Sequence, residues 1–497
     1  VAIKTLNPKW IEQFDLHMYS DQSKMLEITV WDKDYHNKDD IMGRCTIDLN
    51  TLEKETTHRI WKNLEDGAGS IFFLLTISGT QGTETISDLS ACIVDPNERE
   101  KCVARYGFLY SLRNLKDIGH LTVKVFKAQG LAAADIGGKS DPFCVVELVN
   151  SRLQTHTEYK TLAPEWNKIF TFLVKDIHSV LEVTVYDEDR DKRCEFLGKV
   201  SIPLLKIKNG EKRWYALKDK KLRGRAKGQI LLELDIVYNP VRASIRTFNP
   251  KEVKYMQSEQ KFKRSIFMRN VHRMKTMALD FVEVAKFLNS CFQWESAPRS
   301  IVAFIAFLII IYTVELYMVP IVLLLVFLKN YIIITVTGLS FINRDEEEVD
   351  FEDDDEEEED DGKDTKGEEK KSLKEKLQAV QEVTAMVQNI LGEIASMGER
   401  AKNTFNFSVP FLSWLAIFVL TVGTVVLYHV PIRYIFMAWG INKFTKKLRN
   451  PHAVPNNELL DFLSRVPDND EKIMYKDIRP NVSLLTEADK RKTKKTS

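Results

Sequence analysis

Two long apolar stretches constrain this chain more than any other feature. Ile301–Leu328 runs for 28 residues with a single charged side chain, Glu315, and Val409–Val430 contains no Asp, Glu, Lys or Arg. A helix needs roughly 20 apolar residues to cross the hydrocarbon core of a bilayer, whereas an apolar run of about 10–14 residues is more typical of a buried helix in a soluble protein. The sequence therefore predicts an integral membrane protein with an α-helical membrane region.

The two stretches resemble each other. Leu316–Ile321 reads LYMVPI and Leu427–Ile432 reads LYHVPI, so each stretch meets a proline, which kinks or ends a helix. The predicted membrane units, 300–342 and 409–441, are each longer than one upright span. Each is either a kinked helix with an interfacial arm or a hairpin that enters and leaves on the same side.

Charge around these units predicts their orientation. Residues 251–299 carry ten Lys/Arg against five Asp/Glu, and residues 442–497 carry thirteen against eight. Basic flanks stay cytosolic, so we expect both long termini in the cytosol, with 442–497 as a basic tail. Between the units, residues 343–408 carry nine basic and 22 acidic residues. Two full spans would place this loop in a lumen, whereas two hairpins would keep it cytosolic.

Two segments near the membrane units have helical patterns. In 372–402, apolar residues recur every three or four positions, which predicts an amphipathic helix that lies on a membrane, pairs with a partner helix or packs within the protein. The basic region 239–299 predicts a membrane-proximal helix, either at an anionic leaflet or packed internally. Between the units, 343–371 is strongly acidic, which predicts a disordered loop or a weak calcium buffer.

Overall composition excludes several classes of function. The chain has 71 basic and 71 acidic residues, so it has no uniform attraction for nucleic acid. Its six cysteines form no CxxC pair, which indicates reduced thiols and not a disulfide framework or zinc site. It contains no recognisable catalytic motif, so we expect no enzyme activity. The chain begins in mid-pattern at Val1, and we interpret it as a fragment of a longer protein.

The first half of the chain repeats one β unit. Short alternating strands separated by Gly, Pro, Asn and Asp predict an antiparallel sandwich. Two motifs recur: Lys4–Trp10 returns as Lys160–Trp166, and Leu26–Asp34 returns as Leu181–Asp189. We therefore predict a partial domain at 1–78, a linker at 79–116 and a complete domain at 117–238.

Carboxylates recur at fixed places in this repeat. Each copy ends a strand with Asp-x-Asp and has another acid six residues later, namely Asp32, Asp34 and Asp40 in the first copy and Asp187, Asp189 and Glu195 in the second. The complete copy adds Asp135 and Asp141 in an earlier loop. Crowded carboxylates repel one another unless a cation lies between them. Calcium prefers oxygen ligands and tolerates loop geometry, so a calcium site is predicted; a turn-shaping role for Asp-x-Asp is the alternative.

These motifs resemble a known family. Leu131–Phe143, which ends GKSDPF, resembles the first calcium loop of C2 domains, and 187–198 looks like their third loop. The tract 249–451 is similar to the C-terminal region of the multiple C2 domain and transmembrane region proteins. The resemblance implies eight-stranded C2 sandwiches, the first one truncated, that bind Ca²⁺ and acidic phospholipid. It also implies that the carboxylates named above are the calcium ligands, with Glu195 in place of the usual Asp.

The tips of these loops predict how the domain meets a membrane. Ala132–Ala134 offers little apolar surface, and the other tip carries Arg190, Lys192 and Arg193. We expect electrostatic binding in which calcium bridges carboxylates to anionic lipid and the three cations contact phosphate. A purely solvated role for these cations is the alternative.

The resemblance implies an endoplasmic-reticulum or vesicle membrane and a role in trafficking, contact-site tethering or regulated secretion. Acidic phospholipid membranes are the expected partners, together with a protein partner or self-association through the membrane region. The alternative function is a reticulon-like, membrane-shaping scaffold whose C2 domains act without calcium.

Overall fold

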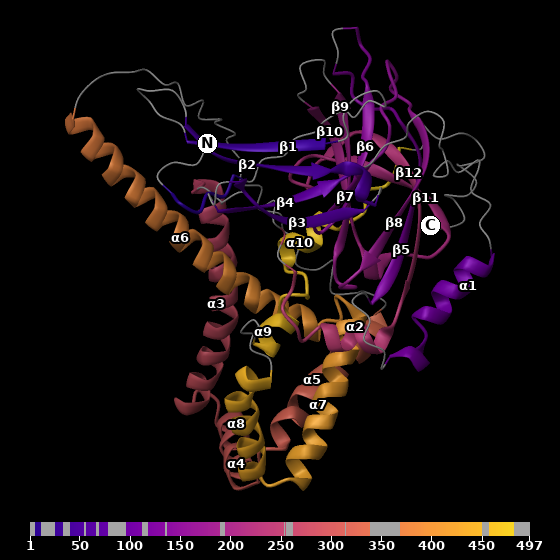
Figure 1. Ribbon diagram of the computed structural model, residues 1–497. Helices are drawn as coiled ribbons and strands as arrows, with labels where there is room; N and C mark the ends of the chain where they lie inside the picture. The colour runs from indigo at the N-terminus through magenta and orange to yellow at the C-terminus, as the bar shows by residue number, and fades with distance from the viewer. Residues whose placement is uncertain are drawn as a thin grey trace. The chain divides into compact units, whose positions relative to one another are not determined.

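Strands fill the first half of the chain and long helices the second half (Figure 1). The computed structural model describes residues 5–10, 25–32, 40–53, 56–65, 69–77, 96–111, 118–134, 137–188, 194–252, 254, 262–313, 315–337, 368–449 and 457–481. The chain divides into two compact units. The first comprises 1–246, 252–257 and 473–497, and the second comprises 247–251 and 258–472.

The first unit contains one complete antiparallel sandwich. Its strands are β5 Gly119–Gln129, β6 Pro142–Leu148, β7 Ser151–Gln154, β8 Glu165–Val174, β9 Val180–Glu188, β10 Cys194–Pro203, β11 Glu211–Lys218 and β12 Arg225–Tyr238. They follow the order β7-β6-β9-β10-β11-β12-β5-β8, in which β10 and β11 pair only at Lys199 and Lys218. The eight strands therefore separate there into two four-stranded sheets, which confirms the predicted fold class.

Alternating hydrophobicity builds the core of this sandwich. Along β5, Leu121, Val123 and Val125 are fully buried while the residues between them are partly exposed. Side chains of a strand point alternately to the two faces, so one face of β5 lines the core. Leu181, Val183 and Val185 are likewise fully buried on β9, where Thr184 between them is buried as well.

The partial domain supplies four strands in two pairs: β1 Met25–Asp32 with β2 Asp40–Asp48, and β3 Thr57–Asn63 with β4 Ser70–Thr76. A short helical turn, η1 Leu49–Thr51, follows β2 in this partial domain. The matching turn of the complete domain, η4 Leu204–Lys206, follows β10. Within the segment predicted as a linker, the structure has helix α1 Pro96–Arg105 and the turn η3 Phe108–Tyr110. Helix α2 Pro240–Arg246 follows the complete sandwich.

A β-bulge at the same place in both copies explains a repeated glycine. The register shifts between Val30 and Trp31 opposite Gly43, and again between Phe196 and Gly198. A side chain at Gly198 would meet the Cβ of Leu217 at 2.7 Å, so the close approach of β10 to β11 requires glycine. Bulges bend a strand and redirect the side chains beyond them. Here those side chains include the repeated carboxylates.

The second unit is helical. Its elements are α3 Arg264–Phe292, α4 Ala297–Thr313, α5 Met318–Thr337, α6 Glu368–Phe405, α7 Pro410–His429, α8 Ile432–Arg449, α9 Glu458–Leu463 and the start of α10 Asn469–Met474. Among the described residues, Met318–Val336 and Pro410–His429 are long and apolar enough to cross a membrane. A third candidate is the pair α3 and α4, which is bent by 101° at its break.

Pro431 marks a helix break as the sequence predicts, whereas Pro320 does not. Within the first apolar stretch, α4 ends at Thr313 and α5 begins at Met318. Glu315 therefore lies in the turn between the two helices, ahead of Pro320. Pro320 is the third residue of α5, where a missing N–H leaves no helical hydrogen bond unmade. In the second stretch, Pro431 directly precedes α8.

Helices α5 and α7 lie side by side in opposite directions (Figure 1). At one end, the rings of Tyr317 and Tyr428 meet edge to face with centroids 5.2 Å apart. At the other, Tyr331 lies 5.8 Å from Trp414, and the Asn330 side-chain amide donates to the Phe405 carbonyl at 3.1 Å. The α4–α5 turn and the α7–α8 turn therefore lie at the same end of this pair, and we call them the hairpin tips.

A C-terminal segment, residues 473–481, lies on the complete sandwich. Lys218 Nζ donates to the carbonyl oxygen of Met474 at 2.9 Å, and Arg213 pairs with Asp477 at 3.1 Å. The backbone N–H of Asn481 donates to the buried side chain of Gln229 at 2.9 Å. Burial lowers the pKa of Lys218, and the carboxylate of Asp477 opposes that shift. The segment thus covers a cationic edge of the sandwich.

Removal of the Lys218 ammonium should release this segment. We expect Lys218→Met to increase the rate at which trypsin cleaves after Lys476, because the carbonyl groups of 473–474 lose a charged donor. Time-resolved mass spectrometry of the digest measures this. Lys220→Met is the matched control, and equal cleavage of both variants would contradict the role given to Lys218.

Candidate functional site

Two predicted carboxylates meet where β6 begins and β9 ends. Asp141 directly precedes β6, and Pro142 pairs in register with Asp187 of β9. The Asp141 N–H donates to Oδ1 of Asp187, and the Glu188 N–H donates to the Asp141 carbonyl at 3.0 Å. Asp187 is only 1 % exposed. This edge of the sandwich therefore holds one buried carboxylate beside a second on the adjoining loop.

Glu195 lies opposite Asp187 across β9 and β10. Directly opposed residues of an antiparallel pair project from the same face, with Cβ atoms roughly 5 Å apart. Glu195 is exposed, so its carboxylate lies at the rim of the site. The topology thus brings Asp141, Asp187 and Glu195 to one edge, whereas the predicted ligands Asp135 and Asp189 lie outside the described residues.

Ser140, which the sequence analysis did not single out, organises the first loop. Its side chain is fully buried; Oγ accepts from the Ala134 N–H at 3.1 Å and donates to the Ala132 carbonyl at 2.9 Å. Its own carbonyl accepts from the Thr161 N–H at 2.9 Å. The sequence feature that could have identified Ser140 is its position directly before Asp141. Its hydroxyl group fixes the backbone that carries the Asp141 carboxylate.

Aromatic rings support the site from inside the sheet. Tyr186, which precedes Asp187, stacks on Phe143 at 5.8 Å and meets Phe196 edge to face at 6.2 Å. Burial raises the pKa of Tyr186, and the Glu147 carboxylate adds to that shift. The ring therefore stays a neutral, rigid neighbour of the carboxylates.

The partial domain repeats this arrangement as far as it is described. Asp32 pairs in register with Asp40, as Asp187 pairs with Glu195. Asp32 is exposed, while Asp34 and the side chain of Asp40 lie outside the described residues. The three predicted lipid-binding cations, Arg190, Lys192 and Arg193, also lie outside them, so their role stays a prediction.

The donor set fits a hard cation. Within the described ranges, no three His, Cys, Asp or Glu side chains lie close enough together to hold a metal. Asp141, Asp187 and Glu195 nevertheless offer only carboxylate oxygens, the ligand type that calcium prefers, and no nitrogen or sulfur that would favour zinc. These three residues would hold part of the coordination sphere of Ca²⁺.

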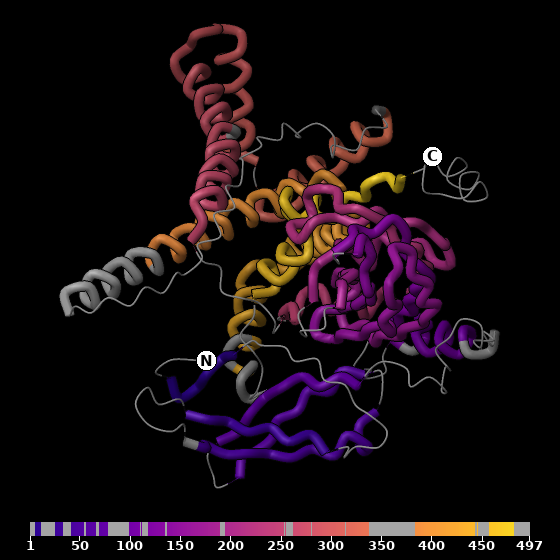
Figure 2. The backbone as a smooth tube through the Cα atoms, turned by 90° about the horizontal axis from the view of Figure 1, so that it is seen from above, coloured from indigo at the N-terminus to yellow at the C-terminus, as the bar shows by residue number. Residues whose placement is uncertain are grey.

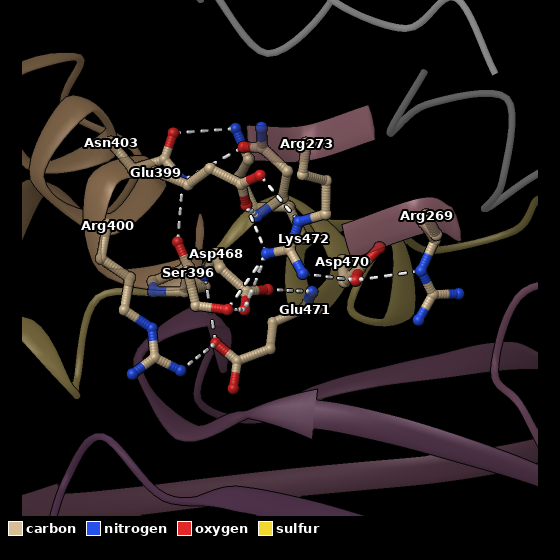
Figure 3. Close-up of polar contacts among 12 residues, drawn as sticks. Arg269, Arg273, Ser396, Glu399, Arg400, Asn403, Asp468, Asp470, Glu471 and Lys472 are labelled. Atoms are coloured by element: carbon tan, nitrogen blue, oxygen red, sulfur yellow. Dashed lines mark hydrogen bonds and ion pairs between the residues drawn. The ribbon is translucent and has the colours of Figure 1, made fainter. Parts of the chain in front are cut away.

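A second polar cluster lies in the helical unit and is drawn in Figure 3. Arg273 of α3 forms a two-pronged ion pair with Glu399 of α6, at 2.8 and 2.7 Å, and contacts Asp468 and Asp470 at 3.4 and 3.1 Å. Asp468 caps α10: it accepts from the Glu471 N–H at 2.8 Å, while Glu471 accepts from the Asp468 N–H at 3.1 Å. We call this set the Arg273 cluster.

The Arg273 cluster bears on the basic membrane-proximal helix, which was predicted either to lie at an anionic leaflet or to pack within the protein. Arg269 pairs with Asp470 at 3.6 Å, and the Arg273 side chain is 12 % exposed. Both cations therefore bind carboxylates of the same unit, as the internally packed alternative requires.

Comparison with known proteins agrees with this architecture. A family model described as C2 domain matches residues 1–64 and 119–217, and one described as plant phosphoribosyltransferase C-terminal matches 343–474. Multiple C2 and transmembrane domain-containing protein 1 of Mus musculus is 53 % identical over 481 residues, 97 % of this chain and 50 % of that protein. The chain belongs to the family of multiple C2 domain and transmembrane region proteins.

Further members and relatives show the same pattern. The Drosophila melanogaster protein of this family is 54 % identical over 476 residues, which cover 95 % of the chain and 51 % of the relative. Synaptotagmin-7 of Mus musculus is 40 % identical over 134 residues, 25 % of this chain and 33 % of that protein. The chain spans about half the length of the family members it matches. It is a C2-domain membrane protein, and the part of the chain that the structure describes includes α5 and α7, which are able to span a bilayer.

Proposed function

We propose that the protein is a calcium-responsive membrane tether. Its membrane helices anchor it in one bilayer, and its C2 domains capture anionic phospholipid on another when calcium is bound. The role is binding and not catalysis. The family membership and the likeness to a synaptotagmin support a place in membrane trafficking, contact-site tethering or regulated secretion, at the endoplasmic reticulum or a vesicle.

The single observation that carries this proposal is the placement of Asp141, Asp187 and Glu195 along one edge of the complete sandwich. Three carboxylates at one edge repel one another, and anionic lipid would add to that repulsion. A bound calcium ion offsets two of the three negative charges and can itself coordinate a phosphate oxygen, so lipid phosphate becomes a favourable partner. Calcium would thus switch the edge from repelling a membrane to binding it.

Vesicle tethering tests this function. We expect the chain, reconstituted in neutral phosphatidylcholine liposomes, to cluster separate phosphatidylserine vesicles when calcium is added. Clustering should weaken as salt rises toward about 0.5 M, because screening shortens the reach of charge interactions. Dynamic light scattering follows the clusters, and neutral target vesicles are the control. Calcium-independent clustering, or clustering that is insensitive to salt, would contradict the proposal.

Membrane shaping is a second candidate, and the hairpin tips favour it. The α4–α5 and α7–α8 turns lie at one end of the α5–α7 pair, so the flanking segments and α6 leave from the other end. Two hairpins that enter one leaflet without crossing it would wedge that leaflet and curve the membrane. Both long termini and the acidic segment would then face the cytosol.

Cysteine labelling separates hairpins that stay on one side from full spans. We expect Gly362→Cys, within the acidic segment, to react with an impermeant maleimide in sealed microsomes whose cytosolic face is outward. Asn481→Cys, in the C-terminal segment, is the reference for cytosolic exposure. Labelling of Gly362→Cys only after detergent is added would indicate a lumenal loop and two single spans.

We also propose that the protein binds a protein partner, or a second copy of itself, through the membrane region. The helices of the second unit, including α6, provide the surface for this contact.

A further inference from the structure

Helix α6 packs with its polar side inward. Gln388, Glu399 and Asn403 on this helix are 0, 6 and 3 % exposed. The side-chain oxygen of Gln388 accepts from the Lys263 backbone N–H at 3.1 Å. The backbone carbonyl of Gln388 accepts from the side-chain amide of Asn270 at 3.1 Å, where α3 crosses α6 (Figures 1 and 2). An amphipathic helix normally buries its apolar face. The polar face of α6 instead contacts α3 at this crossing and contributes Glu399 to the Arg273 cluster.

The apolar side of α6 consequently faces outward. Its residues are Val383, Val387, Ile390, Ile394 and Met397, which are 60, 43, 49, 48 and 45 % exposed. Their spacing alternates four and three residues, the heptad repeat of helices that coil around one another. Going back along the sequence, Val380 and Leu373 precede Val387 by one and two heptads. We call Val383–Met397 the α6 stripe.

We propose that the α6 stripe binds the α6 stripe of a second copy of this chain. The repeat is self-complementary, since its seam holds Val, Ile and Met side chains that fill matching holes on an identical helix. This gives a defined surface to the self-association included in the proposed function, and it needs no calcium. Chains anchored in one bilayer meet at high effective concentration, which favours even a short helical contact.

Charge and direction argue against a lipid surface as the occupant. Membrane-surface helices carry an excess of Lys and Arg on the polar face, but α6 has six Lys/Arg and six Asp/Glu, and the acidic run Asp345–Asp361 precedes it. In Figure 1, α6 ends beside the ends of α5 and α7 that are remote from the hairpin tips, and the rest of the helix extends away from them. The α6 stripe therefore extends away from the bilayer that holds those helices.

Cross-linking in the reconstituted full chain tests the contact. We expect Ile390→Cys, at the middle of the stripe, to form dimers with a short bis-maleimide in neutral liposomes without calcium. Asn389→Cys is exposed but turned by about 100° around the helix, and it should stay monomeric, as should the unmodified chain. Adding Ile394→Glu to Ile390→Cys should lower the dimer yield at least about five-fold, because a charge would enter the seam.

The alternative occupants give different results. If lipid covered the stripe, a polarity-sensitive dye on Ile390→Cys would report an apolar environment that persists after ten-fold dilution with lipid, with no cross-link; that would overturn the proposal. If another region of the same chain covered it, cross-linking would stay low and the dye would be buried in detergent too, which would also overturn it. Loss of dimers leaves calcium-dependent tethering unaffected, so the two proposals fail separately.

Discussion

Loss of the Arg273 side chain should destabilise the helical unit more than any other single change. We expect Arg273→Ala to lower the free energy of unfolding by about 3–5 kcal/mol, the usual consequence of leaving buried carboxylates without their cation. Glu399 and Asp468, with side chains 7 and 9 % exposed, would then face each other without a counter-charge. Thermal unfolding of the detergent-solubilised chain measures the effect. Lys275→Ala, on an exposed turn of the same helix, is the control.

The same cluster predicts a dependence on pH. Burial alone would raise the pKa of Asp468, but hydrogen bonds from the Glu471 N–H and Ser396, with the charge of Arg273, outweigh it and hold the pKa below its ordinary value of 3.8. A lowered pKa in the folded state adds stability at pH values above the unfolded pKa. That stability is lost as the pH falls through the folded value. The difference in the free energy of unfolding between wild type and Arg273→Ala should therefore become smaller below about pH 4. A difference that does not change with pH would contradict the role of the Asp468 carboxylate in this cluster.

Asp187→Asn should remove calcium binding from the complete C2 domain. We expect affinity to fall at least about 100-fold, since even the outer partners of metal ligands contribute 10–100-fold. Asparagine keeps the oxygen that accepts from the Asp141 N–H, so the fold should survive while one negative charge is lost. Terbium luminescence provides the measurement: Tyr186, the residue before Asp187 on β9, can sensitise a bound lanthanide, which calcium then displaces.

Glu188→Gln is the matched control for this variant. It removes the same charge one residue along β9, where the side chain projects from the opposite face of the strand. An equal loss of terbium and calcium affinity in the two variants would mean that overall charge, and not direct ligation by Asp187, governs metal binding. Full retention of terbium by Asp187→Asn would leave the carboxylates as loop scaffolding.

The β domain and its site edge were predictable because their signals are local. The two-residue period of Leu181–Tyr186 and the repeated Asp-x-Asp fix which side chains share a face, and both appear in the sequence as spacing. Ser140 was missed because its role depends on hydrogen bonds to Ala132 and Ala134 in a loop, which no periodicity records.

The helical unit was less predictable because its contacts join distant positions. Arg273 and Glu399 are 126 residues apart, and nothing near Arg273 in the sequence distinguishes it from a lipid-facing cation. The three-to-four-residue spacing in 372–402 predicted an amphipathic helix, but it left open whether the apolar face meets a membrane, a partner helix or the protein itself. Only the crossing with Asn270 of α3 reveals that the polar face is the one used.

The pairing of α5 with α7 also sets an order of events during synthesis. Seventy-two residues separate Thr337, the end of α5, from Pro410, the start of α7. At about 5–20 residues per second, a ribosome needs several seconds to bridge that gap. During this interval the Asn330 amide has not yet met the Phe405 carbonyl, its acceptor in the finished protein. The Asn330 side chain of α5 thus lacks this partner until the end of α6 has been synthesised.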